Sequence, residues 1–245
     1  MTNMIKTKKI VNIKGFTLVE VLFAITIGLL LLGAIFVAVQ SGQRSSVAIE
    51  AKTTAQQDVR AVLELMSLEI GMASYNPTYA LNTIWRNPVG CTTNCVSAGA
   101  DTDKGIRDAT ANTITVEMDI GESRSICDNS NEIISYVYDT ANQRITRSTN
   151  CGNAFEFLGC TDANGDGRCD SNNTLRTVRV INNTLGIPMF RYYNGTNTAT
   201  ANVPDIRRID ITLAVETETI DPNTGQRRRM IYSTSVIPRN HAINP

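Results

Sequence analysis

The sequence predicts an α+β protein in which one long N-terminal helix carries an antiparallel β-sheet domain. Three observations lead to this fold class. An almost wholly apolar run covers residues 16–39, an amphipathic pattern with spacings of three and four continues it, and alternating apolar and polar side chains recur after residue 112. The roughly 200 residues beyond the apolar run are enough for one domain with its own core, and no internal repeat interrupts them.

The first predicted element begins after a short basic leader, residues 1–15, and consists of the apolar run 16–39. As a helix, these 24 residues reach about 36 Å, which is enough to cross a bilayer. The leader has four lysines and no acid, so it should stay in the cytoplasm, with everything after Val39 outside the inner membrane. Glu20 is the only acid in the run. Because a carboxylate in a membrane segment costs about 2.5–3.5 kcal/mol, we expect it to have a function.

Two plainer interpretations of this segment fit less well. A secretory signal peptide has an apolar core of about 7–15 residues followed by a small-residue cleavage site. Here the run is longer, and no Ala-x-Ala pattern closes it before Gln40. A plain membrane anchor accounts for the length but leaves Glu20 unexplained.

An amphipathic pattern predicts that the helix continues past residue 39. Charged and polar residues occupy the remaining faces, so this part needs a folded domain against one side only. We therefore expect one helix over about 16–73, with 40–74 as its amphipathic continuation and Gly28, Gly33 and Gly42 as weak points. The predicted apolar stripe consists of Val47, Ala51, Ala55, Val59, Val62, Leu63, Met66 and Ile70.

The remaining residues, 75–245, predict a β-rich domain. Residues 75–112 are rich in Asn, Thr, Gly and Pro, which is typical of a long irregular connection. The turn 140–142 should join two strands in a hairpin, and Pro222 and Gly225 favour a second reversal of the chain. Strands are expected at 114–120, 132–139, 143–147, 176–181, 189–193, 209–215 and 230–237.

The segment Gly15-Phe16-Thr17-Leu18-Val19-Glu20 resembles the processing site of type IV prepilins and of the pseudopilins of type II secretion. The resemblance implies that a prepilin peptidase cuts between Gly15 and Phe16 and that Phe16 becomes the N-methylated first residue. It also implies an assembly role for Glu20, with Thr17 helping to position the new amino terminus. The helices then form the core of a fibre and the domains cover its outside.

Looser patterns in the domain are similar to the PilW group of minor pilins, which itself resembles the minor pseudopilin GspJ. This resemblance implies a role in pilus initiation or at the pilus tip. The implied partners are minor and major pilins, the prepilin peptidase, the inner-membrane assembly platform and a tip adhesin. The implied location is the inner membrane and then the fibre at the cell surface. A GspJ-like pseudopilin is the first alternative, and a membrane-tethered periplasmic binding or enzymatic domain is the second. The patterns lie at 58–60, 68–73, 114–120, 133–147, 206–209 and 239–240.

The cysteines form an even set in the exported part of the chain, where an oxidising periplasm would pair them. Cys160 and Cys169 flank one short segment and form the favoured bridge. Free or metal-bound thiols are the alternative, but no second Cys/His pair supports a zinc site at Cys91-x-x-x-Cys95. The six candidates are Cys91, Cys95, Cys127, Cys151, Cys160 and Cys169.

Between the last two cysteines, a run of oxygen-bearing side chains at alternate positions resembles the first part of an EF-hand calcium loop. Gly167 permits the sharp bend at position six, but Asn173 stands where the loop needs a bidentate glutamate, so the calcium affinity should be modest. The alternative is a turn that uses these residues for its geometry alone. The predicted ligands are Asp162, Asn164, Asp166, the carbonyl of Arg168 and Asp170.

No catalytic set is present in the sequence, and we expect the protein not to be an enzyme. The only histidine, His241, is expected on the surface of a C-terminal tail. Without the leader, 19 basic and 23 acidic side chains remain, a formal net charge near −4 that does not favour nucleic acid. The run 227–229 of three arginines is too short to change this and should be a solvated hairpin end.

Overall fold

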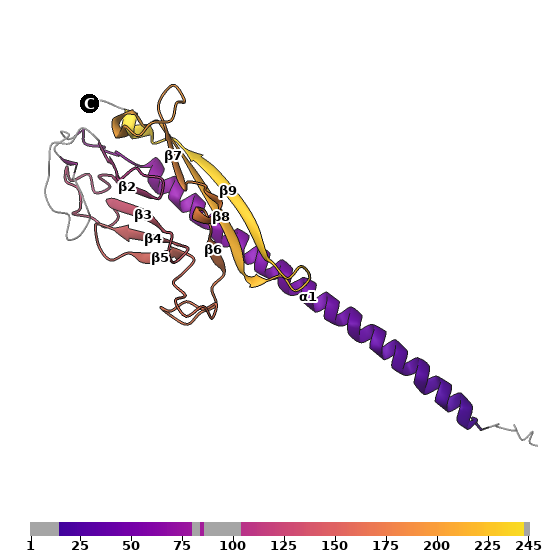
Figure 1. Cartoon of the computed structure of the whole chain (residues 1–245). Coiled ribbons are helices and arrows are strands. Elements are labelled where there is room, and N and C mark those ends of the chain that lie inside the picture. The colour runs from indigo at the N-terminus through magenta and orange to yellow at the C-terminus, as the bar shows by residue number, and fades with distance from the viewer. Residues whose placement is uncertain (1–14, 80–83, 86–103, 243–245) are drawn as a thin grey trace, which may run out of the picture. The chain divides into compact units, whose positions relative to one another are not determined.

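The computed structural model describes residues 15–79, 84–85 and 104–242 of the 245-residue chain. It has one long N-terminal helix, α1 (Leu18–Gly71), followed by strands arranged in two antiparallel sheets (Figure 1). The predicted α+β class is therefore confirmed. The chain divides into two units, Met1–Ser46 and Val47–Pro245, and each is described by itself.

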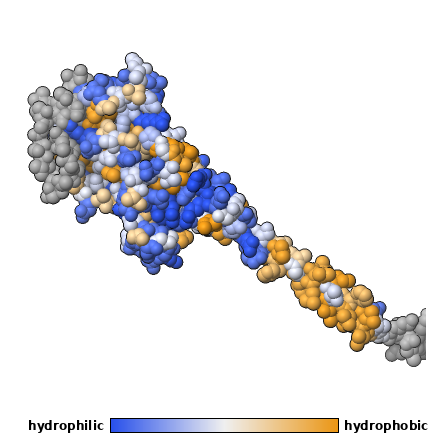
Figure 2. All heavy atoms as spheres, viewed as in Figure 1, coloured by the Kyte–Doolittle hydropathy of each residue, from blue (hydrophilic) through white to orange (hydrophobic). Residues whose placement is uncertain are grey.

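The first unit holds the N-terminal part of α1, whose large apolar side chains are exposed on all faces. Phe16 is 89% exposed and Leu30 70%, and Figure 2 shows this stretch as a largely orange surface. By length and composition, α1 is the one helix of the described residues that could cross a membrane. Such a helix is stable only in lipid or against other apolar helices.

In the second unit, the rest of α1 has the predicted amphipathic character. Ala55, Val59 and Ile70 are completely buried, whereas Leu68 on another face is 64% exposed. The buried stripe begins at Ala48 and not at the predicted Val47, which is 48% exposed. The reason is geometric, because seven residues return a helix to within about 20° of the same face, and Ala48 lies seven residues before Ala55.

The first sheet has five strands in sequence order, each antiparallel to its neighbour. Its central hairpin turns at 140–142 as predicted, because the Asp139 carboxylate accepts the N–H of Asn142 at 3.1 Å. The sequence predicts neither the short first strand nor the fifth strand. The strand predicted at 114–120 ends at Glu117 in the structure, so Ile120 lies outside it and is 41% exposed. The strands are β1 (Ile106–Arg107), β2 (Thr113–Glu117), β3 (Ile133–Asp139), β4 (Arg144–Thr149) and β5 (Phe155–Leu158).

The second sheet is built around one long strand, which pairs with two short strands along one edge and with a long strand along the other. Asn182 fills the gap between the two short strands. Its side-chain amide donates to the carbonyl of Thr212 at 2.8 Å and accepts the N–H of Ala214 at 2.9 Å, as a strand residue would. The strands are β6 (Val178–Val180), β7 (Phe190–Tyr193), β8 (Arg208–Ile220) and β9 (Arg227–Val236).

The predicted reversal between the last two strands is confirmed. The N–H of Gly225 donates to the carbonyl of Asp221 at 2.8 Å, and Gly225 has φ +69°, a conformation that glycine adopts without strain. Arg228 at the base of this hairpin pairs with Asp221 at 2.5 Å. The domain also contains the 3₁₀ turns η2 (Asn183–Leu185), η3 (Val203–Asp205) and η4 (Arg239–Ala242).

One apolar core joins the second part of α1 to both sheets. Met66 of the helix belongs to the same cluster of buried side chains as Tyr136 of β3 and Leu213 of β8. A smaller cluster surrounds Trp85, which is 2% exposed and packs with Ile126 and Ile133. The single tryptophan of the chain is therefore a packed residue.

The expectation of a surface-exposed His241 is wrong. Its ring is 1% exposed, with Nδ1 2.9 Å from Oγ of Ser74 and Nε2 2.8 Å from the carbonyl oxygen of Val203. The 3₁₀ turn η4 follows β9 closely and folds this residue back against the segment after α1. Burial lowers the pKa of His241 from 6.5 to about 4, and the positive charges of Arg207 and Lys104 act in the same direction, whereas the hydrogen bond with Val203 opposes them.

We expect His241 to make the fold sensitive to acid. The ring is neutral in both states at pH 7. As the pH falls from 6.5 toward 4 the unfolded chain takes up a proton that the folded chain excludes, so stability is lost in this window. At about 1.4 kcal/mol per pKa unit, the full loss is on the order of 3 kcal/mol.

Urea unfolding followed by Trp85 fluorescence from pH 7 to pH 4.5 measures this loss. The His241→Asn variant should lose less stability than the wild type over the same window, because its amide does not titrate. The carboxylates are common to both proteins and cancel in the comparison. Parallel pH profiles for the two proteins would contradict the assignment.

Candidate functional site

The first turn of α1 is closed by a reciprocal pair of side chains. The carboxylate of Glu20 accepts the backbone N–H of Thr17 and its hydroxyl, both at 2.9 Å, and the N–H of Glu20 donates to the Thr17 hydroxyl at 3.3 Å. This is a capping box, in which a Thr and a Glu three residues later satisfy N–H groups that the helix leaves unpaired. The pattern Thr17-x-x-Glu20 is the sequence signature of such a cap.

The cap holds the Glu20 carboxylate beside the predicted cleavage site. Both capping residues lie after the Gly15–Phe16 bond, so a cut there leaves the capping box in the mature chain. Among the described residues, no basic side chain forms an ion pair with Glu20. Its charge can therefore be neutralised by a cation from outside the described part of the chain.

The glycines of this segment have no packing role inside the chain. A Cβ atom at Gly15 would meet nothing within 4 Å, and the same is true of Gly28, Gly33 and Gly42. None of these four residues has a positive φ. A requirement for glycine at position 15 must therefore come from a molecule that acts on the chain.

The match to a known family falls on this same segment. Residues 11–36 match the family model described as the prokaryotic N-terminal methylation motif. This motif indicates a type IV pilin-like or pseudopilin protein. It implies processing by a prepilin peptidase and assembly with other pilins, and together with the apolar helix it suggests a membrane-anchored pilin. No curated protein and no solved structure matches the chain, so the finer resemblance to PilW and GspJ remains a prediction.

The predicted bridge between Cys160 and Cys169 is confirmed, with an S–S distance of 2.01 Å and Cα atoms 5.4 Å apart. Cys127 and Cys151 are also disulfide-bonded. No described cysteine is free, and Cys91 and Cys95 lie outside the described residues. In the described part of the chain the cysteines are therefore structural, and the free-thiol alternative does not apply to them.

The loop between Cys160 and Cys169 directs its side-chain oxygens to its own backbone. The two carboxylate oxygens of Asp162 accept the N–H groups of Asp166 and Gly167, each at 3.0 Å. Asn164 accepts from Asp166 at 3.2 Å, Asp166 accepts from Arg168 at 2.8 Å, and just after the bridge Asp170 accepts from Ala163 at 3.1 Å. Such hydrogen bonds are those of a turn that uses these residues for its geometry alone, which is the alternative to a calcium loop.

The calcium ligands fit only in part. No group of three or more His, Cys, Asp or Glu side chains that could hold a metal ion occurs among the described residues. In addition, the Asp162 carboxylate interacts electrostatically with the guanidinium groups of Arg176 and Arg179, and these two groups would compete with a divalent cation for that carboxylate. The loop thus gathers several oxygen donors without a complete set of acidic ligands.

Calcium binding stays a prediction, with an expected Kd on the order of 10⁻⁴–10⁻³ M, as in other weak extracellular sites. Isothermal titration of the mature protein with calcium chloride measures it. The Asp162→Asn, Asp166→Asn double variant keeps one acceptor oxygen at each position of the turn but removes two charges, so it should abolish the binding heat. Absence of heat from the wild type at about 10 mM calcium would rule out the site.

Proposed function

We propose that the protein is a minor pilin of a type IV pilus that acts in pilus initiation or at the pilus tip. The observation that carries this proposal is the methylation motif at residues 11–36, which coincides with the start of an exposed apolar helix. We also propose the prepilin peptidase, other minor and major pilins, the inner-membrane assembly platform and a tip adhesin as partners. No catalytic role is proposed.

The mechanism follows from the chemistry at the start of α1. A cut after Gly15 exposes the amine of Phe16, which carries a positive charge four residues from Glu20. In a medium of low dielectric an unpaired carboxylate is strongly disfavoured, so the amine of an adjacent subunit neutralises Glu20. Pairing of this kind fixes the stagger between neighbouring helices. The cap with Thr17 keeps the carboxylate at the end of the helix where that amine arrives.

The same motif supports a GspJ-like pseudopilin of a type II secretion system, which would use the same pairing in a short periplasmic fibre. The two proposals differ in where the mature protein is found. A minor pilin appears in filaments sheared from the cell surface, whereas a pseudopilin stays with the cell envelope. Fractionation of the native host therefore separates them.

Mass spectrometry of the N-terminal peptide tests the processing on which both proposals depend. We expect a mature chain that begins at Phe16 and carries one methyl group on its amine. The Gly15→Val variant should keep its leader. Gly28→Ala is the matched control, because that glycine is also free of contacts but lies outside the cleavage site, so this variant should be cut normally. A native protein that retains residues 1–15 would contradict the proposal.

A further inference from the structure

Strand β9 is a long edge strand with one open side. Within the described residues it pairs only with β8, over the register from Ile209↔Val236 to Ile220↔Arg227. The side chains of Ile231 and Ser233 are exposed, Ile231 by 57%. An unpaired edge of this length presents a row of backbone donors and acceptors to another chain.

The register shows which backbone groups point outward. The N–H of Thr212 donates to the carbonyl of Met189, and the carbonyl of Ala214 accepts the N–H of Ile181. The backbone N–H and C=O groups of the even-numbered residues of β8 therefore point toward the short strands β6 and β7. The odd-numbered residues of β8 therefore bond to β9, through partners such as Tyr232 opposite Leu213. The backbone groups of the alternate β9 residues, Ile231, Ser233 and Ser235, consequently face away from the sheet.

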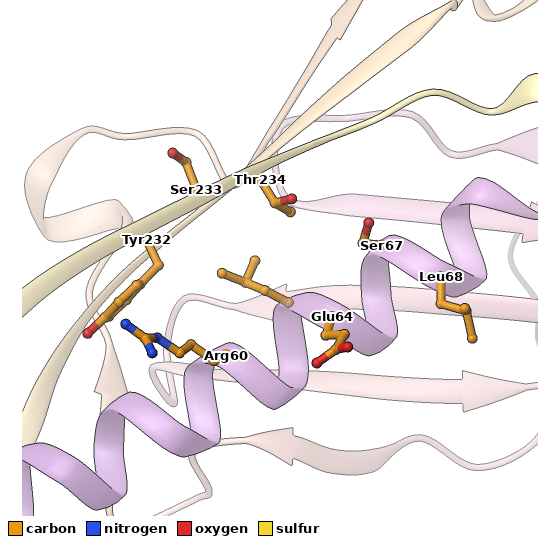
Figure 3. A pocket seen from close by; sticks show the side chains of 8 residues that line it. Arg60, Glu64, Ser67, Leu68, Tyr232, Ser233 and Thr234 are labelled. Carbon is orange, nitrogen blue, oxygen red and sulfur yellow. The ribbon is translucent and has the colours of Figure 1, made fainter.

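A groove runs beside this edge, between β9 and α1. Its upper part is a hollow of about 480 Å³ lined by Arg60, Glu64 and Leu68 of the helix and by Tyr232, Ser233 and Thr234 of the strand (Figure 3). Tyr232 extends from the strand toward Arg60, whereas Ser233 points the opposite way. A strand added to β9 would place every second side chain over this hollow, because residues alternate between the two faces of a sheet.

The groove continues along β9 toward the β8–β9 hairpin and is positively charged. A second hollow of about 430 Å³ is lined by Lys52 and Gln56 of α1 and by β9 from Arg228 to Tyr232. Glu64 is the only acid that lines either hollow. Four basic side chains line the two hollows: Lys52, Arg60, Arg228 and Arg229. Arg228 pairs with Asp221 and Arg229 with Glu216, whereas neither Lys52 nor Arg60 forms an ion pair among the described residues.

We propose that this groove binds an extended acidic segment of another protein by β-strand addition to β9. The outward N–H and C=O groups of Ile231, Ser233 and Ser235 supply the hydrogen bonds, and Lys52 and Arg60 pair with acidic side chains at alternate positions of the added strand. A second copy of β9 is a poor occupant, because this strand carries three arginines and no acid. The proposal does not depend on the filament function, since all the residues involved lie in the unit Val47–Pro245.

Fluorescence anisotropy with a labelled peptide, acetyl-Thr-Glu-Val-Glu-Val-Glu-Val-Thr-amide, tests the groove on the full mature protein in detergent. The same peptide with Lys in place of Glu is the control. We expect the acidic peptide to bind at least about tenfold more tightly than the basic one, and Arg60→Glu to reduce or reverse this preference. Equal binding of the two peptides, or no binding of either, would overturn the proposal.

A backbone variant separates strand addition from charge alone. Ser233→Pro removes an outward N–H group without removing a bond to β8. It should therefore lower the affinity for the acidic peptide at least about tenfold. Ser233→Ala keeps the backbone and should bind like the wild type. Unchanged binding by the proline variant, with Trp85 fluorescence confirming its fold, would exclude strand addition. Should that variant not fold, the acidic peptide with its alternate backbone nitrogens methylated, which keeps its charges, takes its place, and unchanged binding of that peptide would exclude strand addition.

Discussion

Replacing Glu20 with alanine is expected to exclude the protein from filaments while leaving membrane insertion and removal of the leader largely intact. The carboxylate is exposed at the start of α1, and no basic side chain of the described residues pairs with it. Without it, the amine of a neighbouring subunit loses its partner in a medium of low dielectric, and the helices lose the contact that sets their stagger. The amount of the protein in sheared filaments measures the effect.

The capping box provides the matched control for this prediction. Thr17→Ala also breaks the cap, because it removes the hydroxyl that donates to the Glu20 carboxylate and accepts the N–H of Glu20, but it keeps the negative charge. If the role of Glu20 were only to cap the helix, the two variants would have the same modest effect, because losing a cap costs about 0.5–2 kcal/mol. If the charge drives assembly, Glu20→Ala and Glu20→Gln lose filament incorporation and Thr17→Ala retains most of it. Normal filament levels in Glu20→Ala would leave the helix as a simple tether.

The parts of the fold that depend on local periodicity were predictable from the sequence. The amphipathic stripe of α1 from Ala55 to Ile70 and the alternation on both sides of the turn at Gly225 each reflect neighbours a few residues apart. The division into two sheets was not predictable, because it depends on which distant strands meet. Strand β8 pairs with three others, and the side chain of Asn182 completes the ladder between two of them. Strand β1 has only two residues, too few for any pattern.

The candidate site was predictable where a short motif defines it and not where folding creates it. Gly15, Phe16 and Glu20 could be predicted as site residues from their spacing alone, and they lie within the segment 11–36 that matches the methylation motif. The burial of His241 could not, since its partners Ser74 and Val203 are far away in the sequence. The groove along β9 was equally hidden, because it exists only once the strand lies beside α1. The alternating oxygen-bearing side chains after Cys160 did indicate a tight turn. Their hydrogen bonds to the backbone, however, would be the same in a turn that binds no metal.

Breaking the ion pair between Glu69 and Arg147 is expected to destabilise the domain strongly. Arg147 of β4 donates from Nε at 3.0 Å and from Nη2 at 2.6 Å to the two carboxylate oxygens of Glu69 on α1, and Tyr136 of β3 donates its hydroxyl to the same carboxylate. The side chains of the pair are only 10–12% exposed. Removing either partner leaves a buried charge without its counterion, which costs about 3–5 kcal/mol.

Urea unfolding of the mature protein, followed by Trp85 fluorescence, measures this cost for Glu69→Ala and Arg147→Ala. The exposed pair Arg229–Glu216 gives the matched control, because Arg229 is 61% exposed and its replacement by alanine should change stability by about 1 kcal/mol or less. A double variant, Glu69→Leu with Arg147→Met, leaves no unpaired charge and should recover part of the loss. Were the double variant as unstable as the sum of the two single variants, the cost would come from lost contacts between α1 and the first sheet and not from an isolated charge.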